Sequence, residues 1–291
     1  MINISQNQKF FLLAILTFFF FTIADTIIKF IGDTYPLNQL FAFQTICGLL
    51  TVSFFIFVFK QQNTLKTSNI LVHLLRGLCL FVCTYCIYKG IILLPLSIAY
   101  PLILSSPMIL ITMGIVILKE PITVTKIIAL FLSVTAVFLI SGFSYQNGLN
   151  IMGVLYLIAG AVAVSFLDII VKTLGKNEST IALTFYSVLF SAIFFMLISF
   201  YNLEVMSLGD VLLVIISGIL DGSGLLLGAY TIRRIDASIF GFAQYSQLFH
   251  AIILGIFIFG YFPYLLEIIG ALLILFSGIM IFISSKNAKH K

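Results

Sequence analysis

The sequence has little charge: only 9% of its 291 residues are Asp, Glu, Lys or Arg. It contains three histidines and neither a G-x-x-x-x-G-K-[ST] loop nor an H-E-x-x-H motif. The first absence excludes nucleotide hydrolysis through a phosphate loop, and the second leaves a zinc hydrolase few ligands. No polar stretch is long enough to form a soluble domain, so we expect neither an enzyme nor a bound cofactor.

Cysteine is also scarce, with four residues that all lie in apolar stretches, so we do not expect a disulfide framework. Cys79, Cys83 and Cys86 share one face of an expected helix, and thiolates in such a cluster can bind a soft metal such as copper(I). Small, soft side chains also suit helix packing. We favour packing and expect no metal site, and a soft-metal carrier remains an alternative.

What the sequence has in abundance is apolar residues: 62% are hydrophobic, 15% are aromatic, and the mean hydropathy is +1.22. A helix needs about 20 apolar residues to cross a bilayer, whereas strands of a membrane barrel alternate over about ten residues. The continuous runs predict an all-α polytopic membrane protein with ten transmembrane helices. We expect spans at 9–31, 37–59, 69–93, 96–118, 122–141, 151–174, 179–201, 207–232, 236–259 and 263–284.

The net charge of +5 arises from lysines and arginines in the expected membrane loops, so we infer no nucleic-acid partner from it. If the N-terminus is cytoplasmic, thirteen of these residues lie on the cytoplasmic side and two, Lys29 and Lys89, on the other. The positive-inside rule therefore predicts that both termini are cytoplasmic.

The two halves of the chain, 1–145 and 146–291, repeat one another. A D-x-x-x-K phrase begins at Asp25 and again at Asp168, 143 positions later. Each half holds an odd number of expected spans, so the second would enter the membrane upside down relative to the first, as two inverted five-helix repeats. Further echoes are Ser97-Ile98 with Ser238-Ile239, and Pro121 with Pro263.

Several short motifs, taken in order, resemble the drug/metabolite transporter superfamily with two EamA-type half-repeats. The resemblance implies a secondary carrier of small metabolites in a bacterial cytoplasmic (inner) membrane, and the first half looks most like carriers of the S-adenosylmethionine-uptake kind. This chain has Tyr261 where the family usually has an acid. The motifs are Arg76-Gly77, Leu94-Pro95-Leu96-Ser97-Ile98-Ala99, Lys119-Glu120-Pro121, Ile235-Asp236-Ala237-Ser238, Tyr245-Ser246-Gln247-Leu248 and Phe259-Gly260-Tyr261-Phe262-Pro263.

Acids within the expected spans are the first candidates for a substrate site. An acidic side chain near the bilayer centre costs roughly 2.5 to 3.5 kcal/mol, which favours a polar pathway over lipid contact. Asp25 and Asp168 can hold a cationic substrate or a coupling proton, or can pair with Lys29 and Lys172 one turn later. Asp221 has no base within a turn, so we expect it to line a cavity rather than bond to a nearby hydroxyl.

The ninth expected span supplies neutral polar candidates around its midpoint, and these cannot all face lipid. We expect substrate contacts from part of this set, although hydrogen bonds between helices are the alternative, and His250 can be purely structural. The set is Gln244, Tyr245, Ser246, Gln247 and His250.

In the fourth span, Tyr100 is a further candidate for substrate contact. Pro101 and Pro107 each free a backbone carbonyl and can bend the helix, either as a hinge or only for packing. Gly222, in the eighth span, is a third hinge candidate.

Two further charged residues lie near span ends. Arg76 can bind a substrate carboxylate or phosphate, although we favour an extended side chain that reaches the inner interface. Glu120 precedes Pro121 at a helix start and is interpreted as structural, since an acid there complements the helix dipole.

These observations predict a secondary transporter that moves a small polar metabolite, cationic or zwitterionic, by alternating access. S-adenosylmethionine or amino-acid carriage is the specific alternative. A soft-metal carrier and a non-transporting membrane assembly protein are the others. Coupling to a proton or exchange for a counter-solute stays open, and the sequence gives no oligomeric state.

Overall fold

The computed structural model describes residues 6–67, 69–93, 102–141, 150–201, 203–260 and 265–285. Within these ranges the chain is helical, with one short 3-10 helix, η1 (Gln62–Leu65), and no strand. The α-helices are α1 (Gln6–Ile31), α2 (Leu37–Val58), α3 (Ile70–Leu93), α5 (Ser106–Leu118), α6 (Val124–Ser141), α7 (Ile151–Lys172), α8 (Thr180–Ser199), α9 (Leu208–Ile232), α10 (Ala237–Gln244), α11 (Ser246–Phe259) and α12 (Leu265–Ser285).

The helices have the character of membrane spans. Among the described residues, seven helical stretches are long and apolar enough to cross a bilayer, and three shorter apolar helices accompany them. Large apolar side chains cover the outer surface; Leu50, Phe54 and Phe57 of α2 are 63%, 63% and 75% exposed. Such a surface suits hydrocarbon, where helices also satisfy their own backbone groups. The predicted all-α polytopic membrane protein is confirmed at this level.

Two of the expected spans are interrupted. The chain turns at Leu104 and Ser105 just before α5, and Tyr245 separates α10 from α11. At the second break the N–H of Leu248 bonds to the carbonyl of Tyr245, three residues back at 3.1 Å, so one turn of the α-helical ladder is lost. The expected span at 236–259 is matched by the apolar stretch Ala237–Ile258, which is long enough to cross a bilayer, although the break at Tyr245 was not predicted.

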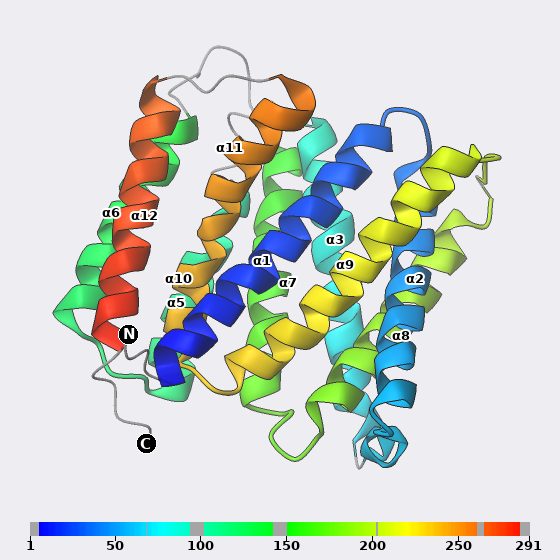
Figure 1. Ribbon diagram of the computed structural model, residues 1–291, viewed down its shortest axis with the longest axis horizontal. Coiled ribbons are helices and arrows are strands. Elements are labelled where there is room, and N and C mark those ends of the chain that lie inside the picture. Colours follow the sequence, from blue (N-terminus) through cyan, green and yellow to red (C-terminus); the bar gives the residue numbers. More distant parts are fainter. Residues whose placement is uncertain are drawn as a thin grey trace.

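The bundle has two helix pairs at its edges and a crowded middle (Figure 1). α6 packs against α12 at one edge, and α2 packs against α8 at the other. Between them, α1 packs along α9, and α3 along α7. α10 packs against α5 and α1, so the interrupted helices meet in the middle of the molecule.

Hydrogen bonds that join loops to helix ends mark the two ends of the bundle. At one end, which we call the basal end, Ser179 Oγ donates to Thr64 O at 2.7 Å, and α1 begins and α12 ends there (Figure 1). At the opposite, apical end, Tyr35 Oη donates to Asp210 Oδ2 at 2.8 Å and Gln39 Nε2 to Glu204 O at 2.7 Å.

Basic residues gather at the basal end. Its loops and adjoining helix ends hold Lys60, Lys66, Lys119, Lys126, Lys172, Lys176, Arg233 and Arg234. The sequence analysis assigned all eight to one side of the membrane. That this side is the cytoplasm stays a prediction.

Glycines bring α2 and α9 into close contact. A Cβ atom on Gly218 would lie 2.4 Å from Cys47 Cβ, and one on Gly222 would lie 2.7 Å from Gly48 O. Neither distance can accommodate a side chain. Gly218 and Gly222 have the small-xxx-small spacing that allows two helices to approach closely.

We predict that Gly222→Ala lowers the melting temperature. Overpacking costs about 1 to 3 kcal/mol, which exceeds the gain in helix propensity of about 1 kcal/mol. Thermal unfolding of the purified protein in detergent measures this.

Gly278→Ala on α12 is the control, because a Cβ atom there meets nothing within 4 Å. It should melt with the parent protein or slightly above it. A Gly222→Ala protein that melts no lower than the control contradicts the close contact between α2 and α9.

Candidate functional site

Two acids from neighbouring helices lie close together inside the membrane bundle. Asp25 of α1 is exposed, and Asp221 of α9 is half-buried. Their charges interact, since α1 and α9 pack along each other. In the part of the chain that the structure describes, neither carboxylate forms an ion pair. Acids within membrane-spanning helices are rare and call for a partner, so the two carboxylates stay candidates for contact with a cation.

Tyr88 of α3 positions the first of these acids. Its hydroxyl donates to Asp25 Oδ1 at 3.2 Å, and its ring packs against Phe41 of α2 with centroids 4.5 Å apart. The sequence analysis did not select Tyr88. An aromatic residue in an apolar helix gives no signal of an acid that precedes it by 63 positions.

Asp168 has different neighbours. It is half-buried on α7, and the guanidinium of Arg76 on α3 is the charge that acts on it. Lys172, one turn later, pairs instead with Glu120, with Nζ 3.5 Å from Oε1. Asp25 likewise bonds to Tyr88 and, within the described residues, forms no ion pair with Lys29. The acid and the lysine of each D-x-x-x-K phrase therefore contact other residues rather than each other.

Arg76 does not reach the membrane interface, which corrects the interpretation that we favoured from sequence. The side chain is 2% exposed and donates to Leu183 O and Ser187 Oγ of α8, both at 2.8 Å. These acceptors and the charge of Asp168 satisfy the guanidinium inside the protein. Arg76 thus joins α3, α7 and α8.

The polar residues of the ninth span point in several directions. Gln244 Nε2 donates to Ser106 Oγ of α5 at 3.1 Å, which is the interhelical bond considered as the alternative. The ring of His250 packs against Phe19 of α1. Tyr245 is fully buried, and among the described residues no hydrogen bond is formed by its hydroxyl, by Ser246 Oγ or by His250 Nδ1. Gln247 is half-buried. Substrate contact for these side chains stays a prediction.

The hinge candidates occupy distinct positions. Tyr100 and Pro101 lie outside the described residues. Pro107 lies in the first turn of α5, where a missing N–H costs no helical bond, and the chain turns just before it. Gly222 packs against Gly48. A bend therefore exists near Pro107, whereas its movement stays a prediction.

The cysteines support packing rather than metal binding. Cys83 is 6% exposed and packs among Leu80, Ala163 and Leu167. Cys86 is 9% exposed. Over the described ranges, no three His, Cys, Asp or Glu side chains gather as a metal site would require. The soft-metal alternative therefore has no structural support.

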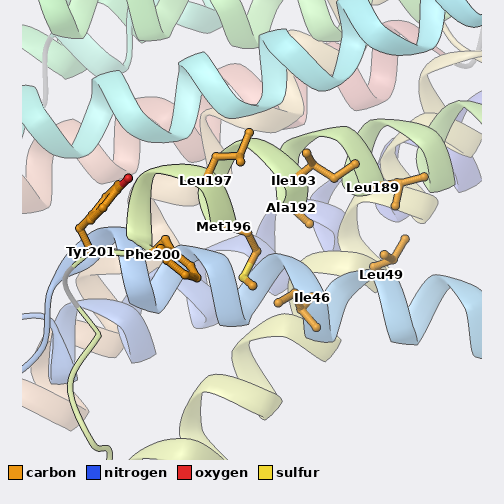
Figure 2. A pocket seen from close by; sticks show the side chains of 9 residues that line it. All are labelled: Ile46, Leu49, Leu189, Ala192, Ile193, Met196, Leu197, Phe200 and Tyr201. Atoms are coloured by element: carbon orange, nitrogen blue, oxygen red, sulfur yellow. The ribbon is translucent and has the colours of Figure 1, made fainter.

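Two cavities of the bundle are apolar. One of about 480 Å³ lies between α2 and α8 (Figure 2), and one of about 240 Å³ lies between α1, α10, α11 and α12. Neither is lined by Asp25, Asp221 or Gln247. The cavity that we expected Asp221 to line corresponds to neither of these and stays a prediction. The residues that line the larger one are Ile46, Leu49, Leu189, Ala192, Ile193, Met196, Leu197, Phe200 and Tyr201.

At the basal end, Glu120 is the centre of a polar cluster. Its carboxylate accepts hydrogen bonds from the N–H groups of Ala237 and Ser238, at 2.5 and 3.0 Å, and from the Ser238 hydroxyl. Lys172 and Lys126 approach it within 3.5 and 3.7 Å. The acid was expected at the start of its own helix, but it caps α10 instead, since the folded loop turns it toward that helix.

The pKa of Glu120 results from opposing effects. Burial raises the pKa of the carboxyl, but the hydrogen bond from the Ser238 hydroxyl, the charge of Lys172 and the two backbone N–H groups together outweigh burial. The net pKa lies below the ordinary value for glutamate, so Glu120 stays ionised at neutral pH.

Comparisons with known proteins agree with a membrane carrier. Residues 8–142 and 151–283 each match the model of the EamA-like transporter family. An S-adenosylmethionine uptake transporter of Rickettsia conorii is 27% identical over 92% of this chain and 90% of its own. One of Rickettsia prowazekii is 27% identical over 97% and 95%. A crystal structure with a TM-score of 0.81 covers 97% of this chain at 14% identity and shares the fold.

We predict that the stability supplied by Glu120 depends on pH. A carboxyl whose pKa is lowered by folding stabilises the protein above its unfolded pKa, and this contribution is lost as pH falls through the folded value. The melting temperature of the parent protein should therefore exceed that of Glu120→Gln at neutral pH.

The gap should close as the buffer is made acidic, because both proteins then carry a neutral side chain at position 120. Both proteins contain the other charges of the cluster, so the difference in melting temperature between them reports on position 120 alone. These charges are Lys126, Lys172 and Asp236. A gap in melting temperature that is unchanged from neutral to acidic pH contradicts the lowered pKa.

Proposed function

We propose, since this chain belongs to the EamA-like transporter family, that it is a secondary transporter for a small cationic or zwitterionic metabolite. The family identifies a transporter of small molecules rather than an enzyme. We take S-adenosylmethionine as the specific substrate, because the Rickettsia relatives are named as its uptake transporters.

The observation that supports this proposal most is the unpaired pair of acids, Asp25 and Asp221. S-adenosylmethionine bears a sulfonium and an ammonium against one carboxylate, so it is a net cation. A membrane helix retains unpaired acids at a cost of several kcal/mol, and a transported cation would offset that cost each time it binds. A protein with a merely structural role would be expected to pair these acids internally.

We further propose that the chain is an inverted repeat of two five-helix units, 1–145 and 146–291. The separate family matches to 8–142 and 151–283 favour this division. The helix packing favours it as well. If α1, α2, α3 and α6 correspond to α7, α8, α9 and α12, the α1–α9 contact becomes the α7–α3 contact, and α2–α9 becomes α8–α3.

Local features recur at a matching interval. Lys119 and Gly260 end α5 and α11 with positive φ angles of 54° and 64°. The turns at Leu104 and Tyr245 interrupt the preceding helices. Both intervals are 141 positions (260 − 119 and 245 − 104). Two segments with the same irregularities at the same spacing are expected of a duplicated unit.

The proposed mechanism is alternating access across this bundle. Asp25 lies toward the apical end of α1, and Asp168 lies one turn from the basal end of α7. A cation that binds between the halves could meet Asp25 and Asp221 from the apical side and Asp168 from the basal side. The basic loops support a cytoplasmic basal end. Both termini would then lie on the cytoplasmic side of the bacterial inner membrane. Coupling to a proton or a counter-solute is compatible with the same acids.

We predict that proteoliposomes containing the purified protein accumulate labelled S-adenosylmethionine. Asp221→Asn and Asp25→Asn should each lower the initial rate about tenfold or more, since the loss of a charge interaction worth about 1.4 kcal/mol corresponds to a factor of ten. Uptake is measured at equal protein density in the liposomes.

Asp210→Asn is the matched control, because it removes an acid of the same helix α9 at the apical surface, where Asp210 bonds to Tyr35 and Ser207. Its uptake should stay within about twofold of the parent rate, as surface charges contribute little. Unaltered uptake in Asp221→Asn would remove that residue from the site. Absence of uptake by the parent protein would overturn the choice of substrate.

A further inference from the structure

The Glu120 cluster joins four separate parts of the chain at the basal end. Glu120 belongs to the loop between α5 and α6, Lys126 to α6, Lys172 to α7, and Ser238 to α10. Asp236 adds a second acid, with Oδ2 3.2 Å from Lys126 Nζ. In the proposed repeat, two of these parts belong to each half. Any movement that separates the halves at the basal end must break this cluster.

Glu120 and Lys126 are buried at the centre of the cluster, and its charges balance. Glu120 is 8% exposed and Lys126 7%, and two carboxylates face two ammonium groups. Lys126 also donates to Ser238 Oγ at 2.8 Å. Removal of one partner from such a group leaves an uncompensated charge, which is strongly unfavourable while the cluster stays closed.

The cluster also controls the position of α10. The N–H groups of Ala237 and Ser238 at the start of that helix have no partner within the helix, and both donate to the Glu120 carboxylate. The positive end of the helix dipole therefore lies against this carboxylate. α10 carries Gln244, whose amide bonds to Ser106 of α5. Glu120 therefore holds the first turn of α10, and the bond from Gln244 to Ser106 holds its last turn against α5.

We infer that Glu120 is a gate residue whose cluster closes the basal end of the transport pathway, below Asp168. This rests on the proposed function, since a gate presupposes a pathway. Lys172 lies one turn basal to Asp168 on α7, so access to Asp168 from that end requires Lys172 and Glu120 to separate. The second half has Tyr261 and Phe262 between Gly260 and Pro263, where the first has Glu120 between Lys119 and Pro121, so the corresponding segment has no carboxylate.

Site-directed labelling tests this gate. Ser106→Cys is the reporter, because Ser106 is 3% exposed and lies between α5, α7 and α10, where Gln244 and Ser165 bond to it. The four native cysteines are replaced by alanine. A membrane-impermeant maleimide is then applied to right-side-out and inside-out vesicles, with and without Glu120→Gln.

Glu120→Gln should speed reporter labelling about tenfold from the basal face and leave the rate from the apical face unchanged, which corresponds to a shift of about 1.4 kcal/mol toward the open state. Acceleration in inside-out vesicles supports both the gate and a cytoplasmic basal end. Acceleration only in right-side-out vesicles supports the gate but reverses the proposed orientation.

Glu178→Gln is the matched control, since Glu178 is a buried acid of the same end that contacts His73 of α3 rather than α10. It should leave reporter labelling unchanged. Asp236→Asn is a milder second variant, because that side chain is 38% exposed, and it should accelerate labelling in the same direction. It also replaces Glu120→Gln if the latter fails to fold.

Folded Glu120→Gln and Asp236→Asn proteins that label at the parent rate overturn the gate. Equal acceleration by Glu178→Gln also overturns it, since general loosening of the basal end would then explain the effect. The labelling needs no substrate, so a parent protein that does not take up S-adenosylmethionine would contradict the proposed substrate and leave the test of the gate intact.

Discussion

The constraint that governs this protein is the cost of an unsatisfied polar group in hydrocarbon. Helices answer it for the backbone, because each satisfies its own N–H and C=O groups. Buried charged side chains avoid this cost when hydrogen-bond partners and opposite charges surround them, as Arg76 and Glu120 show. Arg76 is enclosed by carbonyls, a hydroxyl and the charge of Asp168. Glu120 is enclosed by two N–H groups, a hydroxyl and two lysines. Asp25 and Asp221 form no ion pair within the described chain, and under the proposed function a transported cation would offset the cost of their charge.

The packing of the helices explains how such a pair can exist. Gly218 and Gly222 turn one side of α9 against α2, and Gly224 turns another side against Phe21 of α1. Asp221 lies between these two contacts, so its position is fixed by backbones that cannot move apart without loss of both interfaces. Glycine contacts therefore fix the position of Asp221, whereas Asp25 is held by the hydrogen bond from Tyr88.

Sequence reasoning found what apolar runs and local spacing encode. The predicted spans at 9–31, 37–59 and 207–232 match α1, α2 and α9 within a few residues. Partners distant in the sequence were beyond it. Glu120 and Ser238 are 118 positions apart, and Arg76 and Ser187 are 111 apart. The break at Tyr245 was missed as well, because no proline or glycine marks it.

The central claim is that Asp25 and Asp221 act together on one bound cation. Equilibrium binding of labelled S-adenosylmethionine to purified parent protein, both single Asn variants and the double variant tests it most directly. Two carboxylates that share one cation should give non-additive losses, with a coupling energy of about 0.5 to 3 kcal/mol. Additive losses, or binding that neither substitution weakens, would contradict the account.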